Sequence, residues 1–263
     1  MEETLEKKVV IYSIWHNKLF DEMYEELDEH SLSNIVMYGV NEKYEKIYNP
    51  NKNYQLLFEY DLPIYNSILQ KKNYCQTSCM YHIYENKLHL NANYIGFVQY
   101  DMKLKQQLIY RIEKNITENP SKTVIYYEML EDPEKCLNFD NLTEVYLQII
   151  NSYNTYFKTK FIFSDFSEKS QMVPLLHTFV IPSKMFSKMM EWFISIFDWI
   201  ETTFKNVEKA QLSERIFGLF LCFEAIQDEN IVYEKLETDH IWPLYHDQTA
   251  FDFYKVLVPE NVV

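Results

Sequence analysis

Two short apolar segments and the amphipathic stretch between them limit the folds open to this chain more than any other feature. Residues 8–14 form an apolar, β-rich run that is typical of a buried strand. Apolar residues at three- and four-residue spacing over 19–27 predict a helix, and residues 34–40 predict a second buried strand. A strand, a helix and a strand at this spacing predict a parallel, right-handed βαβ unit at the start of an α/β sheet.

The rest of the chain keeps alternating between strand and helix patterns. Further strands are predicted at 93–100, 123–129 and 175–181, with a strand-like stretch at 254–258. Helices are predicted at 76–88, 105–116, 144–157, 185–203 and 210–225. The weaker pattern of 41–73, with Pro50 and Pro63, predicts loops, and Ser183 is predicted to be an N-cap. No repeat or linker interrupts the pattern, so 1–263 is interpreted as one domain.

Composition excludes several classes of protein. The chain has only 3 glycines, and it contains neither the Gly-x-Gly-x-x-Gly of dinucleotide-binding folds nor the Gly-rich phosphate loop of nucleotide triphosphatases. The Gly-x-Ser-x-Gly of serine hydrolases and the His-Glu-x-x-His of zincin proteases are absent as well. The formal net charge of −14 opposes attraction to nucleic-acid phosphates, so no nucleic-acid partner is expected.

The sequence predicts a cytoplasmic protein. The chain starts with Glu2, Glu3 and Glu6 and shows no apolar signal core. The longest apolar stretch, 185–200, is interrupted by charged residues, so no transmembrane segment is expected. The 4 cysteines are scattered, which is typical of buried, reduced thiols in a cytosolic protein.

Three segments, taken in order, resemble a family of bacterial capsular-polysaccharide glycosyltransferases that is known mainly as a domain of unknown function. The first comprises 76–86 (QTSCMYHIYEN) and 94–100 (YIGFVQY), where the family has a Tyr-Trp-x-x-Lys-Asn helix end and a Tyr-Ile/Val-Gly-x-x-His-Tyr-Arg-Arg strand. The second is 177–186 (HTFVIPSKMF), which is similar to the Asn-Met-Phe strand of the family. The third is 213–218 (SERIFG), which is similar to its Ser-Glu-Arg-Leu stretch.

The chain also departs from this family. Gln99, Tyr100, Asp101 and Met102 stand where the family has His-Tyr-Arg-Arg, so two positive charges that can face a diphosphate are replaced and a carboxylate appears. His177 stands where the family has Asn. The chain is therefore interpreted as a remote member whose handling of the donor differs.

The resemblance implies a fold and a reaction. The fold is a single GT-A-like α/β domain with a mixed, mostly parallel sheet flanked by helices. The reaction is transfer of a sugar from a nucleotide-diphosphate-sugar donor to a glycan or another hydroxyl acceptor. The sugar, the nucleotide, the acceptor, the choice between inversion and retention and the oligomeric state stay open.

A GT-A-like transferase must neutralise the charge that grows on the departing diphosphate, commonly with a divalent cation. Asp101 follows a predicted strand directly, at the end of the sheet where α/β proteins bind ligands. We expect Asp101 to act in catalysis and to bind Mn²⁺ or Mg²⁺, with a late histidine, His246 or else His240, as a second ligand. A site without metal, built on lysines such as Lys103 or Lys105, is the other possibility.

An inverting reaction also needs a base that takes the proton of the acceptor hydroxyl. Glu214 is the candidate, since it begins an otherwise apolar helix within the segment that resembles Ser-Glu-Arg, and Asp247 is the second choice. Arg215 beside it is expected to face a donor phosphate, although an ordinary ion pair on the helix surface explains both side chains as well.

The donor nucleotide is expected at the end of the first strand. Ser13, Trp15 and His16 supply a hydroxyl, a stacking face and an imidazole for the ribose and the base. Thr77 and Tyr81 are expected across from them on the next helix, and packing inside the protein is the competing interpretation for Trp15.

His177 is expected to contact the acceptor sugar, or else to lie hydrogen-bonded in the core. The alternative for the whole chain is a non-catalytic binding or scaffold protein on a degenerate transferase fold. Loss of the two arginines of the family motif is the sequence feature that favours this alternative.

Overall fold

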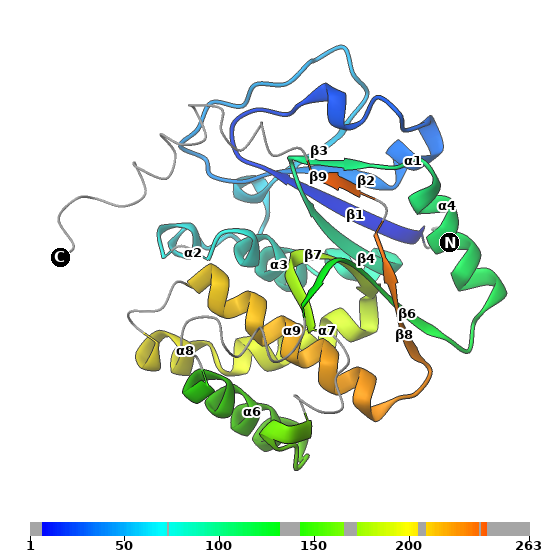
Figure 1. Cartoon of the computed structure of the whole chain (residues 1–263). Helices are drawn as coiled ribbons and strands as arrows, with labels where there is room; N and C mark the ends of the chain where they lie inside the picture. The colour runs from blue at the N-terminus through cyan, green and yellow to red at the C-terminus, as the bar shows by residue number, and fades with distance from the viewer. Residues whose placement is uncertain are drawn as a thin grey trace, which may run out of the picture.

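The computed structural model describes residues 7–72, 74–131, 143–165, 173–204, 209–236 and 238–240. Its centre is a seven-stranded sheet with helices on both faces (Figure 1). The strands lie in the order β3 (Gln55–Phe58), β2 (Ile35–Gly39), β1 (Lys7–Trp15), β4 (Ala92–Gln99), β7 (Val173–Pro182), β6 (Thr123–Glu131) and β8 (Ile231–Lys235). A small second sheet pairs β5 (Met102–Leu104) with β9 (Thr238–His240).

The large sheet is mixed but mostly parallel. Strands β3, β2, β1 and β4 all run in the same direction, with Ile11 beside Ile35 in one register and beside Gly96 in the other. Strand β7 is antiparallel to both of its neighbours, β4 and β6, while β8 is parallel to β6. The predicted mixed, mostly parallel sheet and the predicted βαβ-like parallel pairing of the first two strands are therefore confirmed.

The strand order creates a switch point. The chain proceeds from β1 outward to β2 and β3, and then returns to place β4 on the other side of β1. At the carboxyl ends of β1 and β4 the connections therefore diverge to opposite sides. In α/β sheets, ligands bind in the crevice outside such a point.

Helices form a layer on each face of the sheet (Figure 1). One face carries α1 (Glu29–Ser33) and α4 (Gln107–Glu118). The other face carries α3 (Gln76–Glu85), α7 (Ser183–Ser195) and α9 (Lys209–Gln227), with α6 (Thr143–Phe157) packed outside them. The remaining helices are short: η1 (Asp21–Met23), η2 (Glu59–Asp61), α2 (Ile68–Lys71), η3 (Leu88–Asn91) and α8 (Phe197–Thr203).

The sheet separates two apolar cores. Side chains of β1 alternate between them, because successive residues of a strand point to opposite faces. Val10, Tyr12 and Ile14 pack with the layer of α3, α7 and α9, whereas Val9 and Ile11 pack with the layer of α4. Burial on both faces explains why the first strand is a nearly continuous apolar run in the sequence.

The predicted helix at 19–27 is wrong. Only the single turn η1 forms there, and the segment folds against the sheet as a loop whose Leu19 N–H donates to the carbonyl of Ile47 at 2.9 Å. The apolar side chains that produced the helical pattern are nevertheless buried: Leu19, Phe20, Met23, Tyr24 and Leu27. The three- and four-residue spacing of these apolar side chains therefore indicated which residues are buried, but not that the backbone is helical.

The predicted helix at 185–203 is two helices. Helix α7 ends at Ser195, Ile196 adopts φ −105° and ψ 5°, and α8 starts at Phe197. Ser183 is not an N-cap, since α7 begins with it and Pro182 is the capping residue. The hydroxyl of Ser183 donates to the carbonyl of Ala92 in β4 at 2.7 Å, which ties the start of the helix to the sheet.

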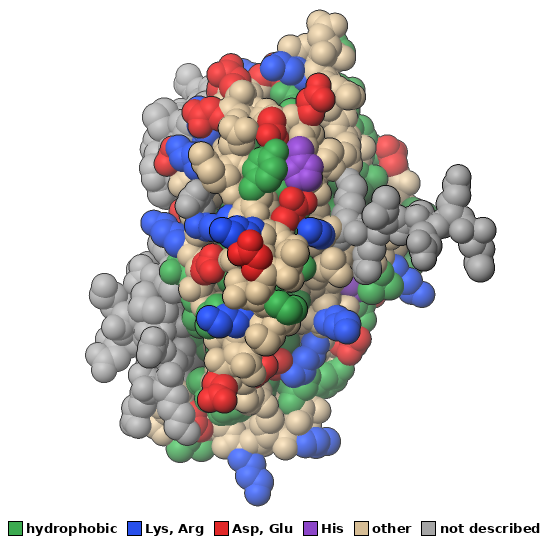
Figure 2. Space-filling model, turned by 90° about the vertical axis from the view of Figure 1, so that its right-hand side faces the viewer, with side chains coloured by type: hydrophobic (Ala, Val, Ile, Leu, Met, Phe, Trp, Pro, Cys, Tyr) green, Lys and Arg blue, Asp and Glu red, His purple; other side chains and the backbone are tan. Residues whose placement is uncertain are grey.

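Short strands escaped the sequence analysis. Strand β3 lies within the stretch 41–73 for which loops were predicted, and β5, β8 and β9 were not predicted. The strand-like stretch 254–258 lies outside the described residues. None of the described helices is long and apolar enough to span a bilayer. Figure 2 shows Lys and Arg side chains intermingled with Asp and Glu on the face it displays.

Candidate functional site

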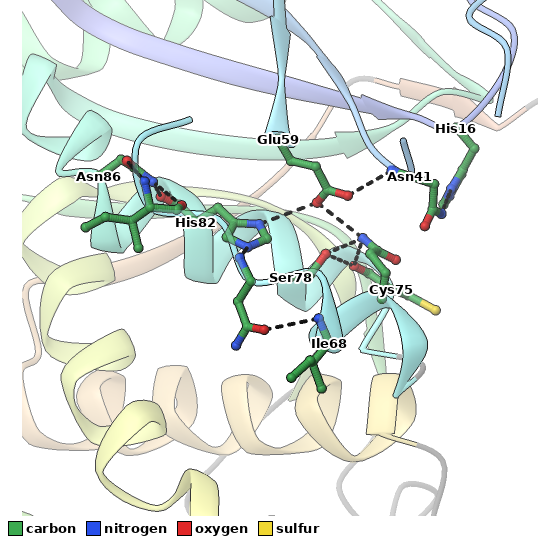
Figure 3. Close-up of polar contacts among 11 residues, drawn as sticks. His16, Asn41, Glu59, Ile68, Cys75, Ser78, His82 and Asn86 are labelled. Atoms are coloured by element: carbon green, nitrogen blue, oxygen red, sulfur yellow. Dashed lines mark hydrogen bonds and ion pairs between the residues drawn. The ribbon is translucent and has the colours of Figure 1, made fainter. Parts of the chain in front are cut away.

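The carboxyl ends of β1, β2 and β3 meet around a buried carboxylate (Figure 3). Glu59 begins η2 directly after β3, and its side chain is fully buried. Its Oε1 accepts the backbone N–H of Asn41 at 2.8 Å. Its Oε2 lies 3.4 Å from Nδ1 of His82 and 3.4 Å from Nε2 of Gln70. A buried carboxylate is tolerated only where hydrogen-bond donors, here the Asn41 N–H and the Gln70 amide, replace water.

His82 connects this carboxylate to α3. The ring is buried, and its Nε2 accepts the backbone N–H of Asn66 at 3.0 Å. In a neutral imidazole with Nε2 as acceptor, the proton lies on Nδ1, which faces Glu59. Gln70 also donates to the hydroxyl of Ser78 near the start of α3. The network therefore fixes the start of α3 against the loops that follow β2 and β3.

Asn41 connects the network to the end of β1. It has a φ of 64°, a left-handed conformation that Asn adopts more readily than most residues. Its side-chain Nδ2 lies 3.1 Å from Nδ1 of His16, which follows β1 directly. Burial, together with the nearby Lys46 ammonium, lowers the pKa of His16 to about 4. His16 is therefore neutral near pH 7, with Nδ1 accepting from Asn41 and the proton on Nε2.

Lys46 holds the loop after β2 in place. Its ammonium donates to the carbonyls of Val40, Asn41 and Tyr44 at 2.9, 2.7 and 3.1 Å. Partial burial lowers the pKa of Lys46 to about 8, although the Glu59 carboxylate opposes this shift. The ammonium also lies 5.9 Å from the centre of the Trp15 ring. A positive charge is thus built into the edge where the first two strands end.

The structure brings three of the predicted site residues into one chain of contacts. Thr77 Oγ1 lies 2.8 Å from Nε2 of His177, and Nδ1 of His177 lies 3.3 Å from Oε1 of Glu214. Thr77 and His177 are buried, whereas the side chain of Glu214 is 21% exposed. An ionised carboxylate can only accept, so a ring with its proton on Nδ1 alone would face Glu214 with a donor and would accept the Thr77 hydroxyl proton at Nε2. The result is a hydroxyl–imidazole–carboxylate relay.

The relay joins three elements that are distant in sequence. Thr77 is in the first turn of α3, His177 is in β7, and Glu214 is in α9. His177 comes two residues before Phe179, which pairs with Phe97 in β4. Because β7 is antiparallel to β4, His177 lies toward the carboxyl end of β4, the same edge as the switch point.

Asp101 lies in the turn that follows β4, and its side chain is fully buried. It is close to Tyr24, whose pKa is raised by burial and, more weakly, by the Asp101 carboxylate. The Tyr24 hydroxyl lies 2.6 Å from the hydroxyl of Ser13, which is also fully buried. Asp101 and Ser13 thus lie beneath the edge of the sheet rather than on its surface.

The other predicted residues take separate positions. Trp15 is fully buried, with its ring 6.0 Å from the rings of Tyr48 and Phe58, so it packs inside the loops at this edge. Tyr81 lies one helical turn after Thr77, 5.6 Å from the His82 ring.

Arg215 does not join the relay in any described contact. Its guanidinium donates to the carbonyl of Gln211 at 3.0 Å, within its own helix. His246 and Asp247 lie outside the described residues. The described residues contain no group of three or more His, Cys, Asp or Glu side chains that could hold a metal ion. Cation binding by Asp101 and His246 stays a prediction, because one of its two ligands is not described.

Sequence reasoning missed the network around Glu59. The signal was present, because Glu59 follows the apolar residues of β3 directly, much as Asp101 comes two residues after the end of β4. Four residues were too short a run to be recognised as a strand, so the position of Glu59 at a strand end was not noticed.

Comparison with solved structures identifies the fold. No protein-family model matches the chain, and no curated protein sequence matches it. The apo structure of WbbM, described as a bifunctional glycosyltransferase, superposes with a TM-score of 0.63 at 15% sequence identity. The match covers 89% of this chain but 45% of WbbM, so the chain spans less than half the length of that protein.

The apo form of mouse xyloside xylosyltransferase 1 aligns over 93% of both chains, at 10% identity and a TM-score of 0.34. A TM-score this low supports no conclusion about a shared fold. The WbbM match and the strand order together define a GT-A-like glycosyltransferase fold. The motif-level resemblance to the capsular-polysaccharide family stays a prediction.

Proposed function

We propose that this protein is a glycosyltransferase that moves a sugar from a nucleotide-diphosphate-sugar donor to a hydroxyl group of a glycan or similar acceptor. One observation carries the proposal: the Thr77–His177–Glu214 relay lies at the ligand-binding edge of a GT-A-like sheet. Fold alone is a weak guide to activity, whereas the side chains at this edge supply the chemistry that a transfer needs.

In the proposed reaction, Glu214 is the base of an inverting transfer. Its carboxylate takes the proton of the acceptor hydroxyl while the acceptor oxygen bonds to the anomeric carbon of the sugar. The bond between that carbon and the diphosphate oxygen breaks, and the nucleotide diphosphate leaves with the electron pair. The His177 imidazole holds the Glu214 carboxylate from the buried side, which supports its orientation.

The donor nucleotide is proposed to lie over the ends of β1 and β4. His16, which is neutral near pH 7, is proposed to contact the nucleotide from the end of β1. Asp101 and His246 are proposed to hold a divalent cation, since carboxylate and imidazole suit Mn²⁺. Such a cation would offset the charge on the diphosphate. Arg215 and Tyr81 are proposed to complete the donor side.

A thermal-shift screen tests this proposal directly. The purified protein is heated with UDP-, GDP-, dTDP- and CMP-sugars, each with and without Mn²⁺. A ligand that binds only the folded state increases the free energy of unfolding and so raises the melting temperature. At a ligand concentration one hundred times Kd the added stability is about 2.7 kcal/mol. We expect one nucleotide diphosphate sugar to stabilise the protein, and more so with Mn²⁺. No shift under any condition would remove the transferase assignment.

A scaffold without activity is the second candidate. Two observations favour the scaffold: Asp101 stands where the family motif has Arg, and Asp101 is completely buried. A donor-hydrolysis assay without acceptor separates the two candidates, because an active transferase slowly hydrolyses its donor whereas a scaffold releases no nucleotide above background. Nucleotide binding with no hydrolysis, with or without Mn²⁺, would favour the scaffold.

A further inference from the structure

A groove lies between α6 and the junction of α7 with α8, on the outer side of the helical layer. Its volume is about 590 Å³, within the range of small-molecule sites. Gln148, Asn151, Thr155 and Tyr156 line it from α6, and Ser195 and Trp199 line it from the junction. The break in the helix at Ile196 helps to form the groove, because α7 and α8 do not continue as one rod.

The groove lies on a different part of the molecule from the strand ends. Helices α7 and α9 lie between α6 and the sheet (Figure 1). Helix α6 is fixed to this layer by the Tyr153 hydroxyl, which donates to Glu224 of α9 at 2.8 Å. Trp192 of α7 donates to the hydroxyl of Ser152 at 3.3 Å. A ligand in the groove would therefore rest on a rigid helical surface outside the proposed transfer site.

The lining of the groove has no charge. Its side chains are amides, hydroxyls, two aromatic rings and one isoleucine. This is unusual for a chain in which 24% of residues are charged and the net charge is −14. Neither an anionic nor a cationic ligand would find an opposite charge here, so the lining favours a neutral ligand.

The polar groups of the lining offer both donors and acceptors. The amide of Asn151 is exposed in the groove, and an amide can both donate and accept. The hydroxyls of Thr155 and Ser195 already donate to backbone carbonyls, at 2.8 and 2.7 Å, so their oxygens remain as acceptors. A ligand rich in hydroxyl groups matches this mixture, because each hydroxyl both donates and accepts.

Two aromatic side chains complete the lining. Tyr156 is 41% exposed, and Trp199 is partly buried with its ring 5.1 Å from Phe204 in an edge arrangement. The face of an aromatic ring is apolar and weakly negative, so it attracts the C–H face of a pyranose ring. Aromatic faces beside amides and hydroxyls are the side-chain chemistry that recognises neutral sugars.

We propose that this groove binds a neutral glycan chain, as a carbohydrate site separate from the strand-end edge. Binding in the groove does not depend on transferase activity. Its use, to hold a growing acceptor polymer against the enzyme, rests on the proposed function. A tethered acceptor would meet the transfer site at a raised local concentration.

Saturation-transfer NMR with defined oligosaccharides tests the groove without any nucleotide sugar. The probes are neutral α-glucan, β-glucan, galactan and mannan hexasaccharides, with an oligogalacturonate as the anionic comparison. We expect at least one neutral probe to bind, and Tyr156→Ala and Trp199→Ala to weaken that binding about tenfold or more. The oligogalacturonate should bind less well than the neutral probe.

Tyr110→Ala is the matched control, because Tyr110 is an exposed tyrosine, at 45%, on α4 at the opposite face of the sheet. Asn151→Ala removes an exposed amide and keeps the assay informative should Trp199→Ala fail to fold. Binding of no neutral probe would overturn the proposal, and so would binding that survives the groove variants or that prefers the anionic probe. The nucleotide thermal-shift screen is independent, so failure of the groove leaves the proposed function standing.

Discussion

At the residue scale, two carboxylates among the described residues are fully buried, in different surroundings. Glu59 receives the backbone N–H of Asn41 and faces the imidazole of His82. Asp101 lies near the buried hydroxyl of Tyr24 and raises its pKa. Removing either carboxylate therefore disturbs the interior, so an isosteric change such as Asp101→Asn is a better test of its role than Asp101→Ala.

The contact between Asn41 and His16 gives a prediction about one proton. Asn41→Asp replaces an amide donor with a carboxylate that only accepts. Asn and Asp both tolerate the positive φ of this position. The proton of His16 should move to Nδ1, and the pKa of His16 should rise from about 4, because the new negative charge stabilises the imidazolium. A ¹⁵N NMR titration of the histidine rings measures both. A His16 ring that keeps its tautomer and its pKa in the variant would contradict the assignment.

Glu214 gives a prediction about the chemical step. Glu214→Gln keeps the shape of the side chain but removes the base, so kcat should fall about 10²- to 10⁴-fold. The KM for the donor and the melting temperature should change little. Glu224→Gln is the control, since Glu224 is a partly buried glutamate on the same helix that pairs with Lys188. Equal losses in the two variants would show that Glu214 acts through stability alone.

The residues of the site were predicted better than their contacts. His177 and Glu214 were singled out within segments that resemble the family, and Thr77 by the place of its predicted helix across from the first strand. Nothing in the sequence indicates that the three side chains touch one another. Their contacts depend on the antiparallel placement of β7 and on how α3 and α9 pack, which are tertiary facts. The Glu59–His82 contact was missed for the same reason, since it joins residues on elements with no local link.

At the scale of elements, β4 depends on a glycine where three strands meet. A Cβ at Gly96 would lie 2.7 Å from Cγ2 of Val180 in β7 and 3.1 Å from Cγ1 of Ile11 in β1. Gly96→Ala should therefore destabilise the fold by about 1–3 kcal/mol, as overpacking of a core does. Urea denaturation followed by circular dichroism measures the change.

A second substitution separates this clash from a general intolerance of alanine in β4. Val180→Ala removes the nearer of the two clashing methyl groups, so the double variant should recover part of the stability lost in Gly96→Ala. If the losses of stability in Gly96→Ala and Val180→Ala simply add in the double variant, the contact with Val180 is not what destabilises Gly96→Ala.

Long strands were easier to predict from the sequence than very short ones. Strands β1, β4 and β7 have 9, 8 and 10 residues and were predicted because their apolar runs are long. Strands β5 and β9 have only 3 residues each, and Lys103 pairs with Asp239 across most of the chain. Three residues are too few to show the alternation of apolar and polar residues that predicts a strand. Residues that pair across so many intervening positions leave no pattern in the local sequence.

At the scale of the whole molecule, two histidines with lowered pKa values, His16 and His89, link stability to pH. Burial lowers the pKa of His16 to about 4 and also lowers the pKa of His89. In the unfolded chain both rings protonate near pH 6.5, so below that pH the unfolded state binds more protons than the folded state. Stability contributed by the neutral rings is therefore full above about pH 6.5 and is lost as the pH falls toward 4.

We expect the urea midpoint to drop between pH 7 and pH 5. His16→Gln should reduce the slope of the unfolding free energy against pH. The reduction is at most that of one bound proton, or about 1.4 kcal/mol per pH unit. Urea titrations at several pH values measure the slope. His30→Gln, a change at a histidine whose side chain is 44% exposed, serves as the comparison. A His16→Gln slope identical to that of the unchanged protein would rule out His16 as a source of the pH dependence.

The reversed strand β7 has a consequence for how the protein can evolve. Glu131 at the end of β6 pairs with Val173 at the start of β7. The chain therefore leaves the sheet and returns to it at the same end of two neighbouring strands. The intervening segment, which includes α6, can be lengthened, shortened or exchanged between lineages without shifting the register of any strand. Changes in α6 can thus alter the proposed glycan groove while the contacts of His177 on β7 stay in place.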